Sequence, residues 1–517
     1  MNLLERSEKW AAEGAWDKII ERLRASPSVP KSPELTLALT KAYLQKAQEN
    51  PQYYWEAQRV LDEGSHTSYW FHNYYQGLID LRLGRPFQAL EDLSEFWSWG
   101  PQHGNYQNWP ELWEEAVSCI SLPKPEPTFR ESVESAWATF LEREAEFEAL
   151  VASAENSHAF KQVDDWLFNV FWPAKLGVWV TFTRHEGEPT LLVWEKKPWV
   201  DGRTVEEELE LLGTSFESDL LCWQYVLDCA PQSVRDRWHL HAGHFPDPEA
   251  HLEWICDEMY PATSVKFRLC GSDPNHLELW LYCQALGYAV EFYPEDAQAY
   301  LEDLVTRLLG EMTAYRYLKT IRIKSEPFPK ARPLTELPAA LAALGITEET
   351  EPIRIAPMME RVFKRVRQPT VRTEVQTNVT RIPQLVQEYR KKKHYIFERL
   401  LRYGIVAGFL VCNRTDTAPF APNEEKYLQQ KLEAYFAEHA GERVLRVFGY
   451  AHSDTTLYLD VFAWDLPNFL VIAKAFFREH TEWCGGFHTY TQEARLIVLS
   501  EATRSPDVVT VPPLVAE

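Results

Sequence analysis

The stretch Tyr403–Leu499 decides the C-terminal fold. It opens with the apolar run GIVAGFLVC at Gly404–Cys412, which is too short to cross a membrane and is typical of a buried strand. Turn-rich residues follow, and the next elements are expected as a helix at Glu424–His439, strands at Arg443–Tyr450 and Thr455–Trp464, a helix at Asp465–Glu482 and a strand at Phe487–Leu499. The order β-α-β-β-α-β predicts a ferredoxin-like α+β sandwich, with both helices on one face of an antiparallel sheet.

Length and composition set the class of protein. A chain of 517 residues is long enough for several domains. It has no apolar stretch of membrane-spanning length, and its charged N-terminus lacks the apolar core of a signal peptide. The 8 cysteines include no C-x-x-C pair, which is typical of reduced thiols. We therefore expect a cytoplasmic protein without a membrane partner. A net charge of −23 argues against wholesale nucleic-acid binding, because phosphate contacts need basic surface.

Residues 1–122 are predicted to be helical throughout, as three helix-turn-helix units with turns at Gly14, Asn50 and Gly84. In the third unit, small residues stand at Gly77 and Ala89, and Pro101 marks the exit. These offsets resemble the tetratricopeptide repeat, although Ile19 replaces the small residue of the first unit. The resemblance implies a stacked array of helix pairs that binds another protein chain.

The helical region is rich in aromatic residues, which have two interpretations. Most of them can fill the core between helices, as aromatic stripes on helices usually do. Others can form a surface for a protein partner. The candidates for partner binding are Tyr54, Trp70, Tyr74 and Trp97.

The remaining chain is divided into an α+β domain at 129–326, a linker with a basic helix at 327–402, the ferredoxin-like domain at 403–502 and a tail at 503–517. Several motifs resemble a family of uncharacterised bacterial proteins: Cys229-Ala230-Pro231, Trp238, Leu309-Gly310-Glu311 and Ile321-Arg322-Ile323. That resemblance implies an α+β module ahead of a smaller one. Some members of that kind look like immunity proteins, which implies a toxin or a secretion-system component as partner.

Three histidines, His239, His241 and His244, form the sharpest chemical cluster. On a strand, His239 and His241 point to the same side, so two imidazoles could share a zinc ion. The alternative is that they line the solvated face of a strand. The alternation with Leu240 and Ala242 favours this alternative, so we expect no metal.

A basic segment, Arg390, Lys391, Lys392 and Lys393, lies in a helix predicted at Ile382–Arg402. Its exposed face could bind nucleic acid or an acidic protein. Pairing with acidic groups of the same chain is the favoured alternative, because no aromatic residue interleaves the lysines as a base-stacking site requires.

Nucleophile and phosphate-binding motifs are missing, since neither G-x-S-x-G nor G-x-G-x-x-G occurs. We therefore expect a protein-binding scaffold without a cofactor rather than an enzyme, with an immunity function toward a toxin as its sharpest form. The alternatives are a metal-dependent hydrolase centred on His239, His241 and His244, and association with nucleic acid through the basic helix.

Overall fold

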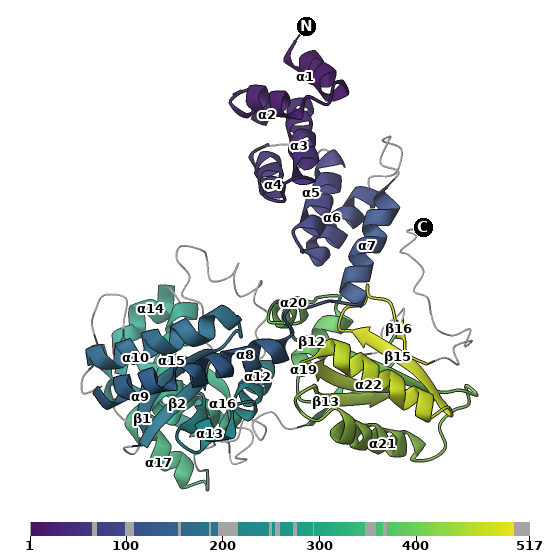
Figure 1. Ribbon diagram of the computed structural model, residues 1–517. Helices are drawn as coiled ribbons and strands as arrows, with labels where there is room; N and C mark the ends of the chain where they lie inside the picture. The colour runs from purple at the N-terminus through teal and green to yellow at the C-terminus, as the bar shows by residue number, and fades with distance from the viewer. Residues whose placement is uncertain are drawn as a thin grey trace. The chain divides into compact units, whose positions relative to one another are not determined.

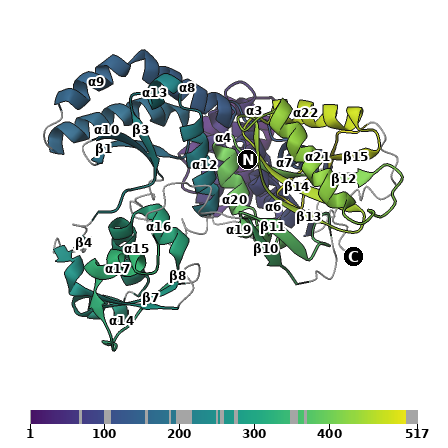
Figure 2. The same cartoon turned by 90° about the horizontal axis from the view of Figure 1, so that it is seen from below.

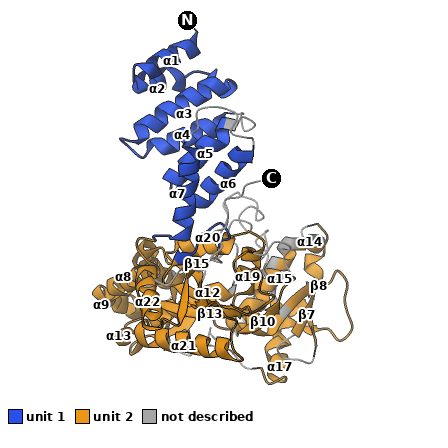
Figure 3. Ribbon diagram, turned by 90° about the vertical axis from the view of Figure 1, so that its right-hand side faces the viewer, with its two compact units in different colours: residues 1–124, 491–497, 506–517 blue, residues 125–490, 498–505 orange. Residues whose placement is uncertain are grey.

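The computed structural model describes residues 2–64, 70–98, 108–153, 157–185, 188–194, 216–247, 251–253, 259–271, 277–292, 294–346, 358–364 and 370–500. The chain is a mixed α+β protein, with helices dominating its N-terminal half and β-sheets its C-terminal half (Figure 1). It divides into two compact units (Figure 3): unit 1 contains Met1–Lys124 with Thr491–Ile497, and unit 2 contains Pro125–Tyr490.

Unit 1 is built from consecutive antiparallel helix pairs. The pairs are α1 (Leu3–Ala12) with α2 (Trp16–Arg24), α3 (Pro33–Ala47) with α4 (Tyr53–Glu63) and α5 (Trp70–Arg82) with α6 (Pro86–Ser98), followed by α7 (Trp109–Ser121). Proline at the start of α3 and α6 suits the first helical turn, where its missing N–H costs no hydrogen bond. Each pair cannot bury its apolar stripe alone, so neighbouring pairs stack.

Small residues in the third pair have two different roles. A Cβ on Gly77 would lie 2.8 Å from Cγ of Leu93 and 3.1 Å from the carbonyl oxygen of Ala89, so α5 and α6 approach closely there. At the turn, Gly84 has a φ of +74° with open space around its Cα hydrogens. Glycine is therefore favoured at this position because the backbone is left-handed, and not because a neighbour packs closely against it.

The first part of unit 2 packs helices against a three-stranded sheet. The sequence pattern predicts one long helix at about Phe129–Ala154, and this helix is interrupted at Arg143. The elements are α8 (Phe129–Glu142), α9 (Glu144–Ser153), α10 (Ser157–Phe171), β1 (Trp179–His185), β2 (Glu188–Trp194), α12 (Phe216–Asp228), α13 (Gln232–Arg235) and β3 (His239–Ala242). The alternating pattern at Leu176–Thr183 and Thr190–Glu195 predicts a β-hairpin, and it is confirmed because β1 and β2 pair antiparallel. β3 adds parallel to β2, which gives the order β1-β2-β3.

The next part of unit 2 contains a two-stranded and a four-stranded sheet. Its strands are β4 (His251–Glu253) and β5 (Met259–Pro261), then β6 (Val265–Cys270), β7 (Leu277–Cys283), β8 (Leu318–Ile323) and β9 (Arg332–Pro333), and its helices are α14 (Gly287–Phe292), α15 (Pro294–Leu309), α16 (Glu311–Tyr317) and α17 (Leu337–Ala342). The larger sheet has the order β8-β7-β6-β9. The sequence pattern predicts a helix at Pro248–Tyr260 and a strand at Tyr288–Tyr293, and both predictions are wrong for the described residues. The first range contains β4 and the start of β5, and the second contains most of α14.

The C-terminal part of unit 2 is organised by a seven-stranded sheet in the order β10-β11-β13-β14-β12-β15-β16. Its elements are β10 (Met359–Val362), β11 (Thr377–Thr380), α19 (Pro383–Arg390), α20 (Tyr395–Arg402), β12 (Val406–Arg414), α21 (Glu424–His439), β13 (Leu445–His452), β14 (Thr456–Ala463), α22 (Leu466–Glu479), β15 (Trp483–Thr489) and β16 (Ile497–Val498). β10 and β11 lie within the range expected as a linker, and they extend the sheet beyond β13.

Different helices pack on the two faces of this sheet. Phe487 on β15 contacts Phe469 of α22, with ring centroids 5.4 Å apart, so α21 and α22 cover that face (Figure 2). On the opposite face, Phe409 of β12 meets Tyr389 of α19 at 5.6 Å. Consecutive strand residues point to opposite faces, and Phe409 and Leu410 therefore belong to different layers.

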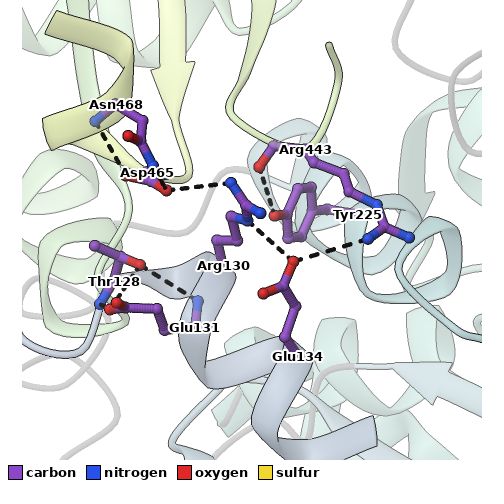
Figure 4. Close-up of polar contacts among 8 residues, drawn as sticks. All are labelled: Thr128, Arg130, Glu131, Glu134, Tyr225, Arg443, Asp465 and Asn468. Atoms are coloured by element: carbon purple, nitrogen blue, oxygen red, sulfur yellow. Dashed lines mark hydrogen bonds and ion pairs between the residues drawn. The ribbon is translucent and has the colours of Figure 1, made fainter. Parts of the chain in front are cut away.

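A junction within unit 2 joins α8 to the C-terminal sheet (Figure 4). The Arg130 guanidinium lies 3.0 Å from Glu134 on its own helix and 3.4 Å from Asp465, the N-cap residue of α22. Tyr225 of α12 donates a hydrogen bond of 2.8 Å to the carbonyl oxygen of Arg443. Beneath these polar contacts the rings of Phe129, Tyr225 and Trp464 pack together at 4.5–5.6 Å. The junction is thus both apolar and hydrogen-bonded.

Candidate partner-binding site

Unit 1 contains a pocket of about 430 Å³ on the side formed by α3, α5 and the start of α7. Apolar and aromatic side chains make one part of its wall: Trp16, Leu44, Tyr54, Tyr75 and Leu78. Polar and basic side chains make the rest, among them Lys41, Gln45, Arg82 and Asn108. A concave site that combines aromatic walls with a few polar groups is the usual form of a binding pocket.

The two cationic side chains of the pocket, Arg82 and Lys41, differ in whether a carboxylate of the chain already pairs with them. Arg82 forms a two-pronged ion pair with Glu115, at 2.5 and 3.1 Å. Lys41 has no carboxylate within ion-pair distance among the described residues, and its ammonium group lies 5.9 Å from the ring centroid of Tyr75. Desolvation lowers the pKa of Lys41. Because Lys41 has no ion-pair partner among the described residues, a carboxylate that enters the pocket could pair with its ammonium group and favour the charged form.

The four aromatic residues proposed from the sequence for partner binding have different locations in the structure. Tyr54 lines the pocket. Tyr74 is only 4% exposed, and its hydroxyl donates a hydrogen bond of 2.5 Å to Asn108 Oδ1, so it belongs to the core. Trp97 is 39% exposed and stacks on Trp109, with centroids 4.5 Å apart. The side chain of Trp70 lies outside the described residues.

Sequence reasoning missed the pocket's polar residues. Nothing in the local sequence of Lys41, Gln45 and Arg82 marks them as residues that line one pocket. One signal was present: Lys41 and Gln45 on α3 and its C-cap residue Gln48 follow a helical spacing, and all three line the pocket.

The basic segment is arranged differently from the expected helix. The predicted helix at Ile382–Arg402 is two helices, because Lys392 adopts a left-handed φ of +57° between α19 and α20. Arg390 donates hydrogen bonds to the carbonyl oxygens of Thr373, Val375 and Lys364, at 2.8–3.1 Å. It therefore fixes the backbone around it and is not a free cation.

Lys391, Lys392 and Lys393 are exposed, and none of them has an ion-pair partner within the part of the chain that the structure describes. The favoured expectation of pairing within the chain is therefore wrong for these three lysines as far as the described residues extend. The amide groups of Lys391 and Lys393 both donate to the carbonyl oxygen of Glu388 at 2.9 Å, which fixes the turn that presents them.

The histidines of β3 pack around one aromatic ring. His241 stacks on Phe245 at 4.0 Å and its Nδ1 lies 3.1 Å from the carbonyl oxygen of Gly243, while His239 is exposed and lies 6.4 Å from the same ring. Burial lowers the pKa of His244, whose backbone N–H donates to Glu311. Among the described residues, no three His, Cys, Asp or Glu side chains converge as metal ligands, so the geometry does not favour the hydrolase alternative.

A buried polar cluster, which no sequence motif indicated, lies on the α19 side of the C-terminal sheet. Arg372 and Asp460 are fully buried and form two contacts, at 2.5 and 2.6 Å. The guanidinium also donates to Asn378 at 3.0 Å and lies among aromatic rings, namely those of Phe409, Tyr458 and Tyr490. Arg372 comes from the segment after residue 369, so this cluster holds that segment on the sheet.

Comparison with known proteins adds no assignment to this geometry. No family model matches the chain, and no curated protein or solved structure shows significant similarity to it. Within the described ranges, no helix combines the length and apolar character that crossing a bilayer requires.

Proposed function

We propose that this protein is a binding scaffold whose helical repeats hold a segment of a partner protein. The observation that carries the proposal is the pocket of unit 1. Its wall includes a cationic side chain, Lys41, and an aromatic side chain, Tyr54. An array of stacked helix pairs presents such a concave surface without any catalytic group. The helix pairing and the close approach at Gly77 support the assignment to tetratricopeptide-like repeats.

The chemistry of the pocket selects the kind of segment. Lys41 favours a carboxylate, while Tyr54, Tyr75 and Leu78 favour an adjacent apolar side chain. A peptide with an acidic residue next to an apolar one satisfies both parts of the wall. In the immunity interpretation, that segment belongs to a toxin or a secretion-system component.

The C-terminal sheet completes the proposed scaffold. The strand order β13-β14-β12-β15, its antiparallel pairing and the two helices on one face support a ferredoxin-like arrangement that carries β10, β11 and β16 as additions. This architecture hosts many unrelated activities, and the proposed binding role therefore rests on the pocket alone.

Selection of peptides tests the proposal. A displayed library of random peptides is selected against the full chain and against its Lys41→Glu variant. We expect the wild type to enrich peptides with an acidic residue beside an apolar one, and Lys41→Glu to weaken their binding about tenfold or more.

The matched control is Lys31→Glu, because Lys31 is an exposed lysine of unit 1 that does not line the pocket. It makes the same change in net charge and should leave the affinity within about twofold of wild type. Selected peptides that bind wild type and Lys41→Glu equally well would contradict the proposal.

A further inference from the structure

One edge of the C-terminal sheet combines a strand that no other described strand covers with a cluster of cations. β10 is the terminal strand of that sheet, and its burial pattern leaves Glu360, Arg361 and Val362 exposed. Val362 is 75% exposed, which is unusual for an aliphatic residue on a strand. Edge strands with exposed apolar residues are templates for pairing with a further strand.

The register of β10 identifies its unused backbone groups. The Phe363 N–H donates to the carbonyl oxygen of Gln376 at 2.7 Å, and Arg361 is opposite Asn378 in the same antiparallel ladder. In such a ladder, alternate residues direct their N–H and C=O groups toward the partner strand and the others direct them away. Glu360 and Val362 therefore direct theirs to the outer side, where no described strand pairs.

The lysine turn lies beside this edge. Arg390 donates to the carbonyl oxygen of Lys364 at 2.8 Å, and its guanidinium lies 4.9 Å from the ring centroid of Phe363. The end of α19 is thereby fixed next to the end of β10, and Figures 2 and 3 show these two elements side by side. We call the cations of this region the basic edge: Arg361, Lys364, Lys391, Lys392 and Lys393. All five are exposed, and none forms an ion pair with the described residues.

We propose that the basic edge binds an extended acidic segment of a partner protein, which adds as a further strand to β10. Main-chain hydrogen bonds to Glu360 and Val362 would supply affinity, and carboxylates on the added strand would meet the lysines. This surface belongs to unit 2, and it is independent of the pocket in unit 1.

Two other occupants fit the observations less well. A second copy of the chain that paired β10 with β10 antiparallel about Arg361 would bring the two Arg361 side chains together, and like charges opposite each other destabilise a sheet. Nucleic acid could use the lysines but not the outward backbone groups of β10, which a further strand would pair.

A synthetic peptide of about eight residues that alternates Glu and Val, with a fluorescent label, serves as the probe for the full chain. Val362→Pro removes the outward N–H of β10 and leaves the ladder to β11 in place, because proline is tolerated at the solvent side of an edge strand. We expect Val362→Pro to weaken peptide binding about tenfold or more. The same peptide with N-methyl groups on alternate residues should lose affinity similarly, and this arm requires no change in the protein.

Charge reversal of the lysines tests whether they contact carboxylates of the added strand. Lys391→Glu with Lys392→Glu should weaken binding about tenfold. Lys426→Glu with Lys474→Glu makes an equal change in net charge at exposed lysines outside the basic edge, and should leave the affinity within about twofold.

Three outcomes would overturn the proposal. One is the absence of peptide binding to the wild type. Another is binding that depends on the lysines but is unaffected by both Val362→Pro and N-methylation, with single-stranded DNA bound equally well, which would indicate a general polyanion surface. The third is self-association of the wild type that Val362→Pro abolishes, which would assign the edge to a second copy of the chain.

Discussion

Gly449 and Asp460 are opposite each other on β13 and β14, and the Asp460 carboxylate occupies the space that a side chain at residue 449 would need. A Cβ on Gly449 would lie 2.6 Å from Oδ2 of Asp460 and 2.8 Å from the carbonyl oxygen of Val379. The glycine thus permits both the buried ion pair and the approach of β11.

Replacement of this glycine should therefore be costly. We expect Gly449→Ala to destabilise unit 2 by about 1–3 kcal/mol, because the new methyl group overpacks a backbone contact that cannot move aside. Urea unfolding followed by the fluorescence of buried tryptophans measures the change. Gly287→Ala is the control, since a Cβ there meets nothing within 4 Å and alanine is the better helix former. Equal stability of Gly449→Ala and wild type would show that the packing around Asp460 is wrong.

The Arg372–Asp460 pair should contribute far more than a surface pair. Asp460→Asn leaves the guanidinium of Arg372 buried without a counter-charge, and such a loss costs about 3–5 kcal/mol. The comparison is Asp416→Asn. It removes one of the two carboxylates that pair with Arg414, at 2.7 Å, and leaves Glu424 in place, so it should cost less than about 1 kcal/mol. Similar losses in the two variants, measured by urea unfolding, would contradict the buried geometry.

Prediction from the sequence succeeded where one physical signal dominated. The helix expected at Glu424–His439 has those bounds in α21, because Leu428, Leu432 and Phe436 recur on the face that packs on the sheet. It failed at Gly485-Gly486, because a glycine pair after an expected helix is typical of a cap and turn. Both lie inside β15, where a Cβ on Gly485 would lie 1.8 Å from the Val411 carbonyl oxygen. A glycine selected by a close neighbour in space has the same local signature as a turn glycine.

The candidate site was less predictable than the fold. Tyr54 could be nominated because an aromatic side chain on a helical array is a recognisable candidate for partner binding. Lys41 could not, since its importance depends on which carboxylates are absent around it after folding. The same limit applies to Arg372, whose partner Asp460 is distant in the sequence and joins it only when the segment after residue 369 docks on the sheet.

The stability of the third helix pair of unit 1, α5 with α6, should depend on pH. Burial, with the neighbouring Asp80 carboxylate, raises the pKa of Asp92 to about 8, against about 4 in an unfolded chain. Between these values the folded state retains a proton that the unfolded state has lost, so stability falls as pH rises from about 4 to about 8. Amide hydrogen exchange, corrected for its intrinsic pH dependence, should therefore show weaker protection of α5 and α6 at pH 8 than at pH 6.

The variant Asp92→Asn isolates this effect, because it keeps a hydrogen-bond donor toward Asp80 and removes the titrating group. Its protection in α5 and α6 should change little between the two pH values. Asp17→Asn is the control at an exposed carboxylate, and it should retain the pH dependence of the wild type. An equal pH dependence in Asp92→Asn would assign the effect to another group.

Substitution of Tyr54 should affect peptide binding, whereas substitution of Tyr74 should affect the stability of unit 1. Tyr54 lines the pocket, so Tyr54→Ala should raise the dissociation rate of a selected acidic peptide about tenfold and change the protection of α3 and α4 from exchange very little. Tyr74 lies in the core, where its ring meets Phe96 at 5.4 Å and its hydroxyl bonds to Asn108. Tyr74→Ala should therefore destabilise the third helix pair by about 3 kcal/mol or more.

Peptide affinity and amide exchange measured on the same two variants separate these roles. Loss of affinity in Tyr74→Ala should follow the loss of protection as temperature is varied, because both arise from opening of the helix pair. In Tyr54→Ala, affinity should be lost while protection stays. The reverse assignment, with Tyr54→Ala unfolding the array and Tyr74→Ala affecting only the peptide, would move the binding surface to the other side of α5.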